Sequence, residues 1–214
     1  MKAEKTYLFD FDGTLVDSMP TFVSVMLRIL DEYGIKYDRD IVKVITPLGY
    51  HGTAEYYRGL GIAVPTEALV KQMNEYALDA YANTIPAKNT VIETLKALKA
   101  RGDSLNVLTA SPHTMIDACL KRLGIWDIFD NVWSCDDFAT TKSNPEIYKM
   151  AAKRMGKRID SIIFVDDNIN AVKTAKRAGM QAYAIYDPSS AEYEAEMRAA
   201  ADRYLKEFVE LLNG

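Results

Sequence analysis

The segment YLFDFDGT, residues 7–14, places two carboxylates just beyond an apolar run. Asp10 and Asp12 flank a single phenylalanine, and side chains two positions apart in an extended chain point to the same face. At an effective dielectric constant of about 20, two such charges ~4 Å apart repel by roughly 4 kcal/mol. Three arrangements would relieve this repulsion: a cation between the carboxylates, a protonated carboxyl group, or a turn that separates them.

Three further polar signals follow apolar segments or loops. Thr109 follows LNVL, Lys142 follows the loop DDFATT, and the pair Asp166 and Asp167 follows IIFV. In a parallel sheet the ends of such strands can converge on one side. Carboxylates and carbonyls suit Mg²⁺, whereas a hydroxyl and an ammonium suit phosphate oxygens. The set predicts a centre that handles a phosphoryl group together with a hard metal.

Short β-rich segments separated by helical segments would position these residues. This alternation predicts a mostly parallel, doubly wound α/β sheet that helices cover on both faces. The predicted strands are Tyr7–Phe9, Leu105–Leu108, Val132–Ser134, Ile162–Val165 and Ala182–Ile185.

Capping signals and helical spacing predict the helices of this layer. Thr90 and Glu93 fit a capping box, whereas Ser111 and Asn144 each precede a proline, which is typical of an N-cap followed by the first helical residue. After Ser190 the apolar spacing predicts one long C-terminal helix that covers the core. Its inward-facing residues would be Tyr193, Met197, Tyr204, Phe208 and Leu211.

Residues 18–84 interrupt the alternation with helical periodicity and no convincing strand. Two apolar stripes, one ending at Gly34 and one beginning at Thr66, predict helices. We therefore predict an α/β core made of residues 1–17 and 85–214, and an inserted all-helical cap made of residues 18–84. An insertion after the first strand would place the cap above that strand's carboxyl end, where α/β sheets bind ligands.

The composition is that of an ordinary globular protein. The chain has 214 residues, 49% hydrophobic and 26% charged, and a formal net charge of −4. Because acidic and basic residues are mixed, we expect no nucleic-acid partner. No apolar stretch approaches the ~20 residues of a membrane span, and no signal-peptide pattern opens the chain. Cys119 and Cys135 fit no disulfide framework or metal spacing, so we expect a cytoplasmic protein.

As a set, the motifs resemble those of the haloacid dehalogenase superfamily of phosphohydrolases. DFDGT at 10–14 matches the first motif, Thr109 the second, Lys142 the third and VDDN at 165–168 the fourth. The helical insertion matches the cap that this family carries directly after its first motif. The resemblance implies a Rossmann-like core and Mg²⁺-dependent hydrolysis of phosphate esters.

The resemblance assigns roles that the chemistry also requires. Asp10 would be the nucleophile that forms an aspartyl-phosphate, and Asp12 the general acid for the leaving oxygen and then the base for water. Thr109 and the backbone amide of Ala110 would hold the phosphoryl oxygens. Lys142 would neutralise charge near Asp10.

The resemblance also implies a set of metal ligands. Asp10, the backbone carbonyl of Asp12, and Asp167 would bind Mg²⁺, and Asp166 would be a second ligand or would hold a metal-bound water. The chain departs from the family pattern in three places: KSNP replaces the frequent Lys-Pro-x-Pro, Asp166 replaces a frequent glycine, and Ala171 replaces a further acid. The choice between Asp166 and Asp167 therefore stays open.

His51 is the candidate substrate-binding residue of the cap. It lies in TPLGYHGT, a glycine-rich segment that we predict to be a loop between cap helices. The segment resembles the part of the cap that reaches into the active site in this family. The alternative is a solvated surface histidine, because long loops mostly lie on the surface.

We expect a Mg²⁺-dependent phosphatase for small phosphorylated metabolites, most similar to phosphoglycolate-phosphatase-like members, and a monomer or small homo-oligomer. The nearest alternative is β-phosphoglucomutase, which shares this core and cap, but the chain lacks the Gly-Val-x-Arg loop of the mutases. A phospho-acceptor receiver domain would carry its acidic pair before the acceptor aspartate, the opposite of the order here. A non-enzymatic binding module would be expected to lose Asp10 or Asp12.

Overall fold

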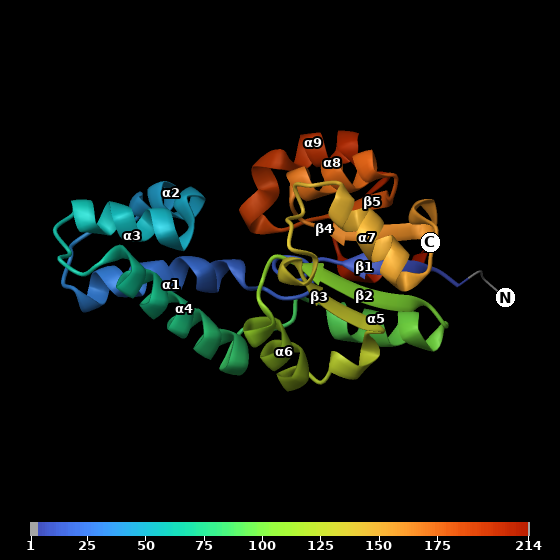
Figure 1. Cartoon of the computed structure of the whole chain (residues 1–214), viewed down its shortest axis with the longest axis horizontal. Coiled ribbons are helices and arrows are strands. Elements are labelled where there is room, and N and C mark those ends of the chain that lie inside the picture. Colours follow the sequence, from blue (N-terminus) through green and yellow to red (C-terminus); the bar gives the residue numbers. More distant parts are fainter. Residues whose placement is uncertain (1–3, 214) are drawn as a thin grey trace. The chain divides into compact units, whose positions relative to one another are not determined.

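A parallel β-sheet organises the part of the chain that carries the predicted motifs (Figure 1). The structure, a computed structural model, describes residues 4–213. Within them the strands are β1 (Thr6–Phe9), β2 (Ser104–Thr109), β3 (Asn131–Ser134), β4 (Ile162–Asp166), β5 (Gln181–Ile185) and β6 (Arg203–Leu205). Their order is β3-β2-β1-β4-β5-β6, and every neighbouring pair is parallel. β1 and β4 are buried along their whole length, as expected for strands that helices cover on both faces.

Helices cover both faces of this sheet. They are α5 (Val91–Ala100), α6 (His113–Arg122), α7 (Glu146–Met155), α8 (Ile169–Ala178) and α9 (Glu194–Ala200). Figure 1 shows α5 and α6 on one face and α7 and α8 on the other. The predicted doubly wound α/β fold is thereby confirmed. The strand order reverses between β1 and β4, so the crevice at their carboxyl ends is the expected ligand site.

The chain divides into two compact units. One contains the residues up to Asp17 and those from Pro86 onward, and the other contains Ser18–Ile85. The second unit consists of helices: α1 (Met19–Glu32), α2 (Ile41–Ile45), α3 (Gly49–Gly59) and α4 (Thr66–Asn83), with a short 3-10 turn at Thr46–Leu48. We call the two units the core unit and the helical unit. That the helical unit serves as a cap stays a prediction.

The helical unit has an apolar core of its own. The buried residues recur at helical spacing on α1 and α4: Val25, Met26, Ile29 and Leu30 on the first, and Leu69, Met73 and Ala77 on the second. Tyr57 of α3 is fully buried and its hydroxyl donates to the Met26 carbonyl oxygen at 2.9 Å. Among the described residues, no helix in either unit is long and apolar enough to cross a membrane.

The predicted long C-terminal helix is wrong. The chain instead forms a 3-10 turn at Pro188–Tyr193, the short helix α9, the strand β6 and a 3-10 turn at Phe208–Asn213. β6 pairs with β5, and the carboxylate of Asp202 accepts a hydrogen bond from the Ala182 amide at 2.8 Å. The helical spacing of the apolar residues does not produce a helix here. A strand at this position pairs with backbone groups of β5 that a helix would leave unpaired at the edge of the sheet.

Three local predictions also need correction. The segment around His51 is the beginning of α3 and not a loop. Thr90 has a left-handed backbone (φ 62°) and makes no cap bond; its hydroxyl accepts from the Val209 amide at 3.2 Å. Ser111 does not cap α6, because its hydroxyl donates to Asp12 at 2.5 Å. In the last two cases a partner distant in sequence competes successfully for the capping side chain.

Candidate active site

A tight turn follows β1 and carries both aspartates of the first motif. The Val16 amide donates to the Phe11 carbonyl at 3.1 Å, and the Gly13 amide donates to the Val16 carbonyl at 3.0 Å. The chain therefore turns back on itself between Phe11 and Val16. Asp12 lies on this turn, and its charge still contributes to raising the pKa of Asp10.

Gly13 lies where no other residue would fit. Its φ is +76°, and a Cβ built on it would lie 2.5 Å from Oδ2 of Asp167. The next residue, Thr14, donates from its hydroxyl to Oδ1 of Asp167 at 3.0 Å. The glycine thus lets the turn after β1 approach the carboxylate that follows β4.

Asp166 and Asp167 lie at the end of β4, one strand away from Asp10. Oδ1 of Asp166 accepts from the Asn168 amide at 2.7 Å, and Asn168 is the residue that caps α8 with its side chain. Asn168 therefore caps α8, and both aspartates remain directed to the end of the sheet.

Lys142 provides the cation of the site. Its Nζ donates to Oδ1 of Asp10 at 2.5 Å and to Oδ2 of Asp166 at 2.8 Å. The lysine reaches this position from the loop before α7, where its carbonyl accepts from the Tyr148 hydroxyl at 3.0 Å. Burial alone would lower the pKa of Lys142, but the charges of Asp10 and Asp166 raise it well above its ordinary value. The lysine therefore stays protonated.

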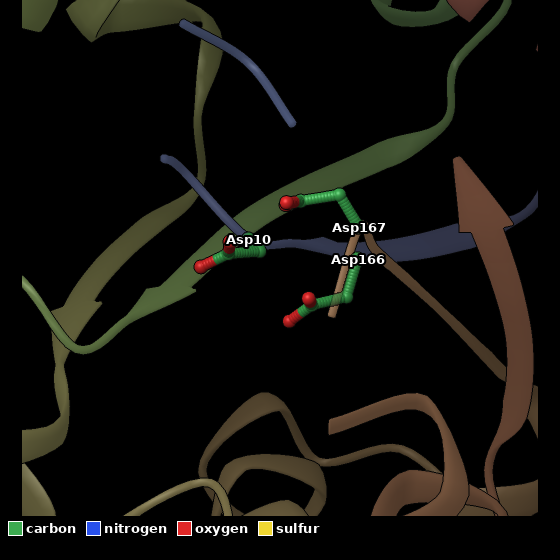
Figure 2. A group of neighbouring side chains, drawn as sticks. All are labelled: Asp10, Asp166 and Asp167. Carbon is green, nitrogen blue, oxygen red and sulfur yellow. The ribbon is translucent and has the colours of Figure 1, made fainter. Parts of the chain in front are cut away.

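Asp10, Asp166 and Asp167 form a compact, buried group of carboxylates. One oxygen from each lies within 4.8 Å of the others. Figure 2 shows the three side chains extending to the same side from the ends of β1 and β4. Burial raises the pKa of Asp10 well above its usual range, and the other carboxylates add to this effect while Lys142 opposes it. Burial and the charge of Asp166 raise the pKa of Asp167 to about 7.

These residues fit a divalent cation. Carboxylate oxygens are the preferred ligands of Mg²⁺, and the raised pKa values of Asp10 and Asp167 record the cost of gathering such oxygens here. Lys142 alone supplies less positive charge than the cluster carries when it is ionised. A bound divalent cation would offset the remaining repulsion, and the donor set therefore matches the predicted metal.

Thr109, Ala110 and Asp12 lie beside this group on the β2 side. Thr109 is the last residue of β2, fully buried, and its hydroxyl accepts from the Ser111 amide at 3.0 Å. Ala110 follows and is exposed. Oδ2 of Asp12 accepts from the Ser111 hydroxyl at 2.5 Å, so the Asp12 side chain is directed toward the segment that follows β2.

His51 belongs to the helical unit. It lies on α3 and is exposed, and its Nδ1 is 4.0 Å from Oε1 of Glu55 one turn later. Its role toward a substrate stays a prediction.

Sequence reasoning missed three residues near the site: Ser111, Lys88 and Asp187. Ser111 holds Asp12, and Lys88 forms an ion pair with Asp187 while contacting the Gly13 carbonyl. Each partner lies about 75 to 99 residues away along the chain. No local pattern of charge or periodicity predicts such contacts.

Comparisons with known proteins identify the family of the chain. The family model of haloacid dehalogenase-like hydrolases matches residues 4–179. Pyrophosphatase PpaX of Bacillus velezensis is 30% identical over 174 residues, covering 80% of this chain and 78% of its own. A phosphoglycolate phosphatase of Pectobacterium atrosepticum is 29% identical over 177 residues, covering 80% of this chain and 75% of its own.

A solved structure shares the fold over nearly the whole length. It is a protein of Thermotoga maritima provisionally named a β-phosphoglucomutase, with a TM-score of 0.84, 24% identity, and coverage of 98% of this chain and 97% of its own. The motifs in order, the matching family model and the named relatives agree. The chain is a hydrolase that belongs to the haloacid dehalogenase-like family.

Proposed function

We propose that this protein is a Mg²⁺-dependent phosphatase that hydrolyses small phosphorylated metabolites through an aspartyl-phosphate on Asp10. The contact between Lys142 and the buried Asp10 carboxylate, beside Asp166 and Asp167, carries the proposal. It gives the nucleophile a cation that offsets charge and a group of oxygens suited to a metal. Relatives named as phosphatases support this reaction class.

In the first step an Asp10 oxygen attacks phosphorus and the ester P–O bond breaks. Asp12 gives its proton to the leaving oxygen. In the second step Asp12 takes a proton from water, the water oxygen attacks phosphorus, and the bond to Asp10 breaks. Thr109 and the amide of Ala110 hold the phosphoryl oxygens, and Lys142 offsets their charge.

The geometry favours Asp167 over Asp166 as the direct metal ligand. Both oxygens of Asp166 already accept hydrogen bonds, from Lys142 and from the Asn168 amide. Asp167 accepts a hydrogen bond on Oδ1 only, from the Thr14 hydroxyl, among the residues that the structure describes. Asp10, the Asp12 carbonyl and Asp167 would hold Mg²⁺, with Asp166 holding a water of its shell; the ion would supply neutralising charge to the phosphoryl group.

The substrate class follows from what the relatives share. A pyrophosphatase and a phosphoglycolate phosphatase have the phosphoryl group in common and differ in what carries it. We therefore propose small phosphorylated metabolites as substrates and the cytoplasm as the location, where both free, buried cysteines would stay reduced. We also propose a monomer or small homo-oligomer.

Release of inorganic phosphate from a panel of phosphorylated metabolites tests this proposal. The wild-type protein should release phosphate with Mg²⁺ and stop in excess chelator. Ca²⁺ should suppress release, because it takes more ligands in a looser geometry and would engage both Asp10 oxygens. A sugar phosphate that is interconverted without release of phosphate would favour the β-phosphoglucomutase alternative.

The variant Asp10→Asn should reduce release to background, and Asp127→Asn, an exposed aspartate on the turn after α6, is its matched control. Full activity in Asp10→Asn, or in chelator, would sink the proposal.

A further inference from the structure

The segment that returns from the helical unit to the core is bonded to the turn after β1. The Asp17 amide donates to the Pro86 carbonyl at 3.0 Å, and the Lys88 amide donates to the Leu15 carbonyl at 3.0 Å. Val16 and Ala87 form an antiparallel bridge between these bonds. Lys88 is therefore fixed by its backbone beside the turn that carries the first motif.

The ammonium of Lys88 joins three segments of the core unit. Its Nζ donates to the Gly13 carbonyl at 2.5 Å, to the Tyr186 carbonyl at 2.9 Å and to Oδ2 of Asp187 at 2.8 Å. These contacts use all three donors that a lysine has. The Asp187 side chain is 1% exposed and also accepts from the amide and hydroxyl of Ser189. Burial opposes its ionisation, yet the bonds from Lys88 and Ser189 hold its pKa below the usual range.

Gly13 connects the Lys88 ammonium to the carboxylates of the site. Its carbonyl faces Lys88, and its Cα lies so close to the Asp167 carboxylate that a Cβ would collide with it. Thr14, the next residue, bonds Asp167, and Asp12 is the residue before. A shift of the Gly13 carbonyl therefore moves the peptides that carry Asp12 and Thr14.

We propose that Lys88 is a positioning residue for phosphoryl transfer: its bond to the Gly13 carbonyl fixes the turn that places Asp12 and supports Asp167. The inference rests on the proposed function and adds a residue outside the four motifs. Lys88 is not a catalytic residue, because it reaches the reaction only through Gly13.

A cavity beside Lys88 makes the proposal testable by chemical rescue. It has a volume of about 350 Å³ and its lining includes Thr14, Lys88, Tyr186 and Phe208. Lys88→Ala removes three methylenes and the ammonium, which is the composition of n-propylammonium. The added cation can enter this cavity and meet the three acceptors that Lys88 leaves behind.

The experiment measures kcat and KM for hydrolysis of an aryl phosphate. Lys88→Ala should lose roughly 10²-fold in kcat, the scale of an ångström-sized displacement of catalytic groups, with KM within about threefold of wild type. n-Propylammonium should restore kcat in a saturable manner, and n-propanol should not. Lys176→Ala is the control, because it removes an ion pair between the last turn of α8 and Asp202, the residue before β6, and should keep full activity. Wild-type kcat in Lys88→Ala would overturn the proposal.

A double variant separates positioning from simple loss of a buried ion pair. Removing Lys88 alone leaves the Asp187 charge unpaired and buried, which destabilises the fold. Lys88→Ala/Asp187→Asn removes both charges, so Tm should recover while kcat stays low. If kcat recovered together with Tm, Lys88 would matter only as the partner of Asp187 and the proposal would fail.

A measurement of thermal stability, which needs no hydrolysis, tests this inference separately from the proposed function. Mg²⁺ should raise the Tm of the wild type, because a ligand that binds the native state stabilises it. The rise should be smaller in the double variant, whose Asp167 loses support from the turn. A wild type that gains Tm in Mg²⁺ without hydrolysing any ester would overturn the proposed function, and the Mg²⁺ response alone would then decide on Lys88. An equal rise in wild type and double variant, or none in either, would overturn the proposal for Lys88.

Discussion

The core unit and the helical unit treat charge in opposite ways. The core unit buries the carboxylates of Asp10, Asp103, Asp166, Asp167 and Asp187. The helical unit, all of whose residues are described, buries only uncharged polar side chains: Ser18, Thr53 and Thr66. Its ion pairs, such as Arg28 with Glu32, lie in solvent. One unit therefore carries desolvated charge and the other does not.

From this difference we predict that the core unit carries the reaction and that the helical unit determines which substrates are bound. Buried charges destabilise a fold unless they are paired, whereas exposed pairs contribute about 0–1 kcal/mol. A chain that keeps carboxylates buried at the ends of β1 and β4 keeps them for a reaction or a metal. Substitutions in the core unit should therefore abolish steps of the reaction, and those in the helical unit should change which substrates are bound.

The largest effect should separate Asp10 from Asp12. With an aryl phosphate, whose leaving group needs little protonation, Asp12→Asn should form the phospho-enzyme and hydrolyse it slowly, giving a burst of phenol. Loss of one proton-transfer role lowers the rate about 10²- to 10⁴-fold. Asp10→Asn should give no burst, because it lacks the nucleophile. Rapid-quench measurement of phenol checks this, and a burst from Asp10→Asn would reverse the two assignments.

Gly13→Ala should have the second-largest effect on activity. The backbone at φ +76° costs an alanine roughly 1–2 kcal/mol, and the new methyl group collides with Asp167. We expect a loss of roughly 10²-fold in kcat. Gly124→Ala is the matched control, since Gly124 has φ +68° and open space around its Cα. It should lose similar stability and keep its activity; equal kinetics in the two variants would show that contact with Asp167 is unimportant.

His51→Ala tests the helical unit. If His51 donates one hydrogen bond to a charged substrate, its loss is worth about 1.5 kcal/mol, which is roughly tenfold in KM. kcat should change little, because the residue takes no part in bond breaking. Steady-state kinetics on the best substrate, with Glu55→Ala as control, decides this. A collapse of kcat would break the division between the units.

The smallest effect concerns His113 on α6. Its Nδ1 lies 3.0 Å from Asp117 and its Nε2 lies 2.8 Å from Asp137. Hydrogen bonds from His113 to Asp117 and then Asp137 raise the pKa of the histidine. The stabilisation is therefore complete below the unfolded pKa of about 6.5 and is lost as pH rises through the higher folded value.

His113→Gln tests this sign. The wild type should exceed the variant in Tm near pH 5.5 and lose this advantage at alkaline pH. Because the histidine is 40% exposed, solvent screening limits the effect to at most about 1 kcal/mol. For a chain of this size that is about 2–4 °C in Tm. An advantage that grows with pH would contradict the assignment of an imidazolium.

Local sequence patterns predict the strands and the polar residues that follow them. β1 and β4 are short, apolar and buried, so their composition announces both the strand and its end at Asp10 and Asp166. The 3.6-residue spacing likewise predicts α1 and α4, because each buries one stripe of side chains. Asp10 and Asp166, which both accept from Lys142, follow these strands and are predicted for the same reason.

The predictions that were wrong, and the residues that were missed, concern contacts with partners distant in sequence. β6 exists because β5 offers an edge, although its own three residues carry no strand signal. Ser111 has the right type and neighbour for a helix cap, but Asp12 competes for its hydroxyl. In the sequence Lys88 is one lysine in a loop, and only the folded chain shows its contacts with Gly13 and Asp187.

The antiparallel bridge between Val16 and Ala87 has a consequence for the order of folding. It joins positions separated by roughly 70 residues, and closing a flexible loop of that length costs about 4 kcal/mol of chain entropy. If the inserted helices form first, their ends are already held and the core closes a much shorter effective loop. Replacing residues 18–85 by a short turn between Asp17 and Pro86 should speed refolding of the sheet when the sheet closes first, and leave the rate unchanged when the inserted helices form first.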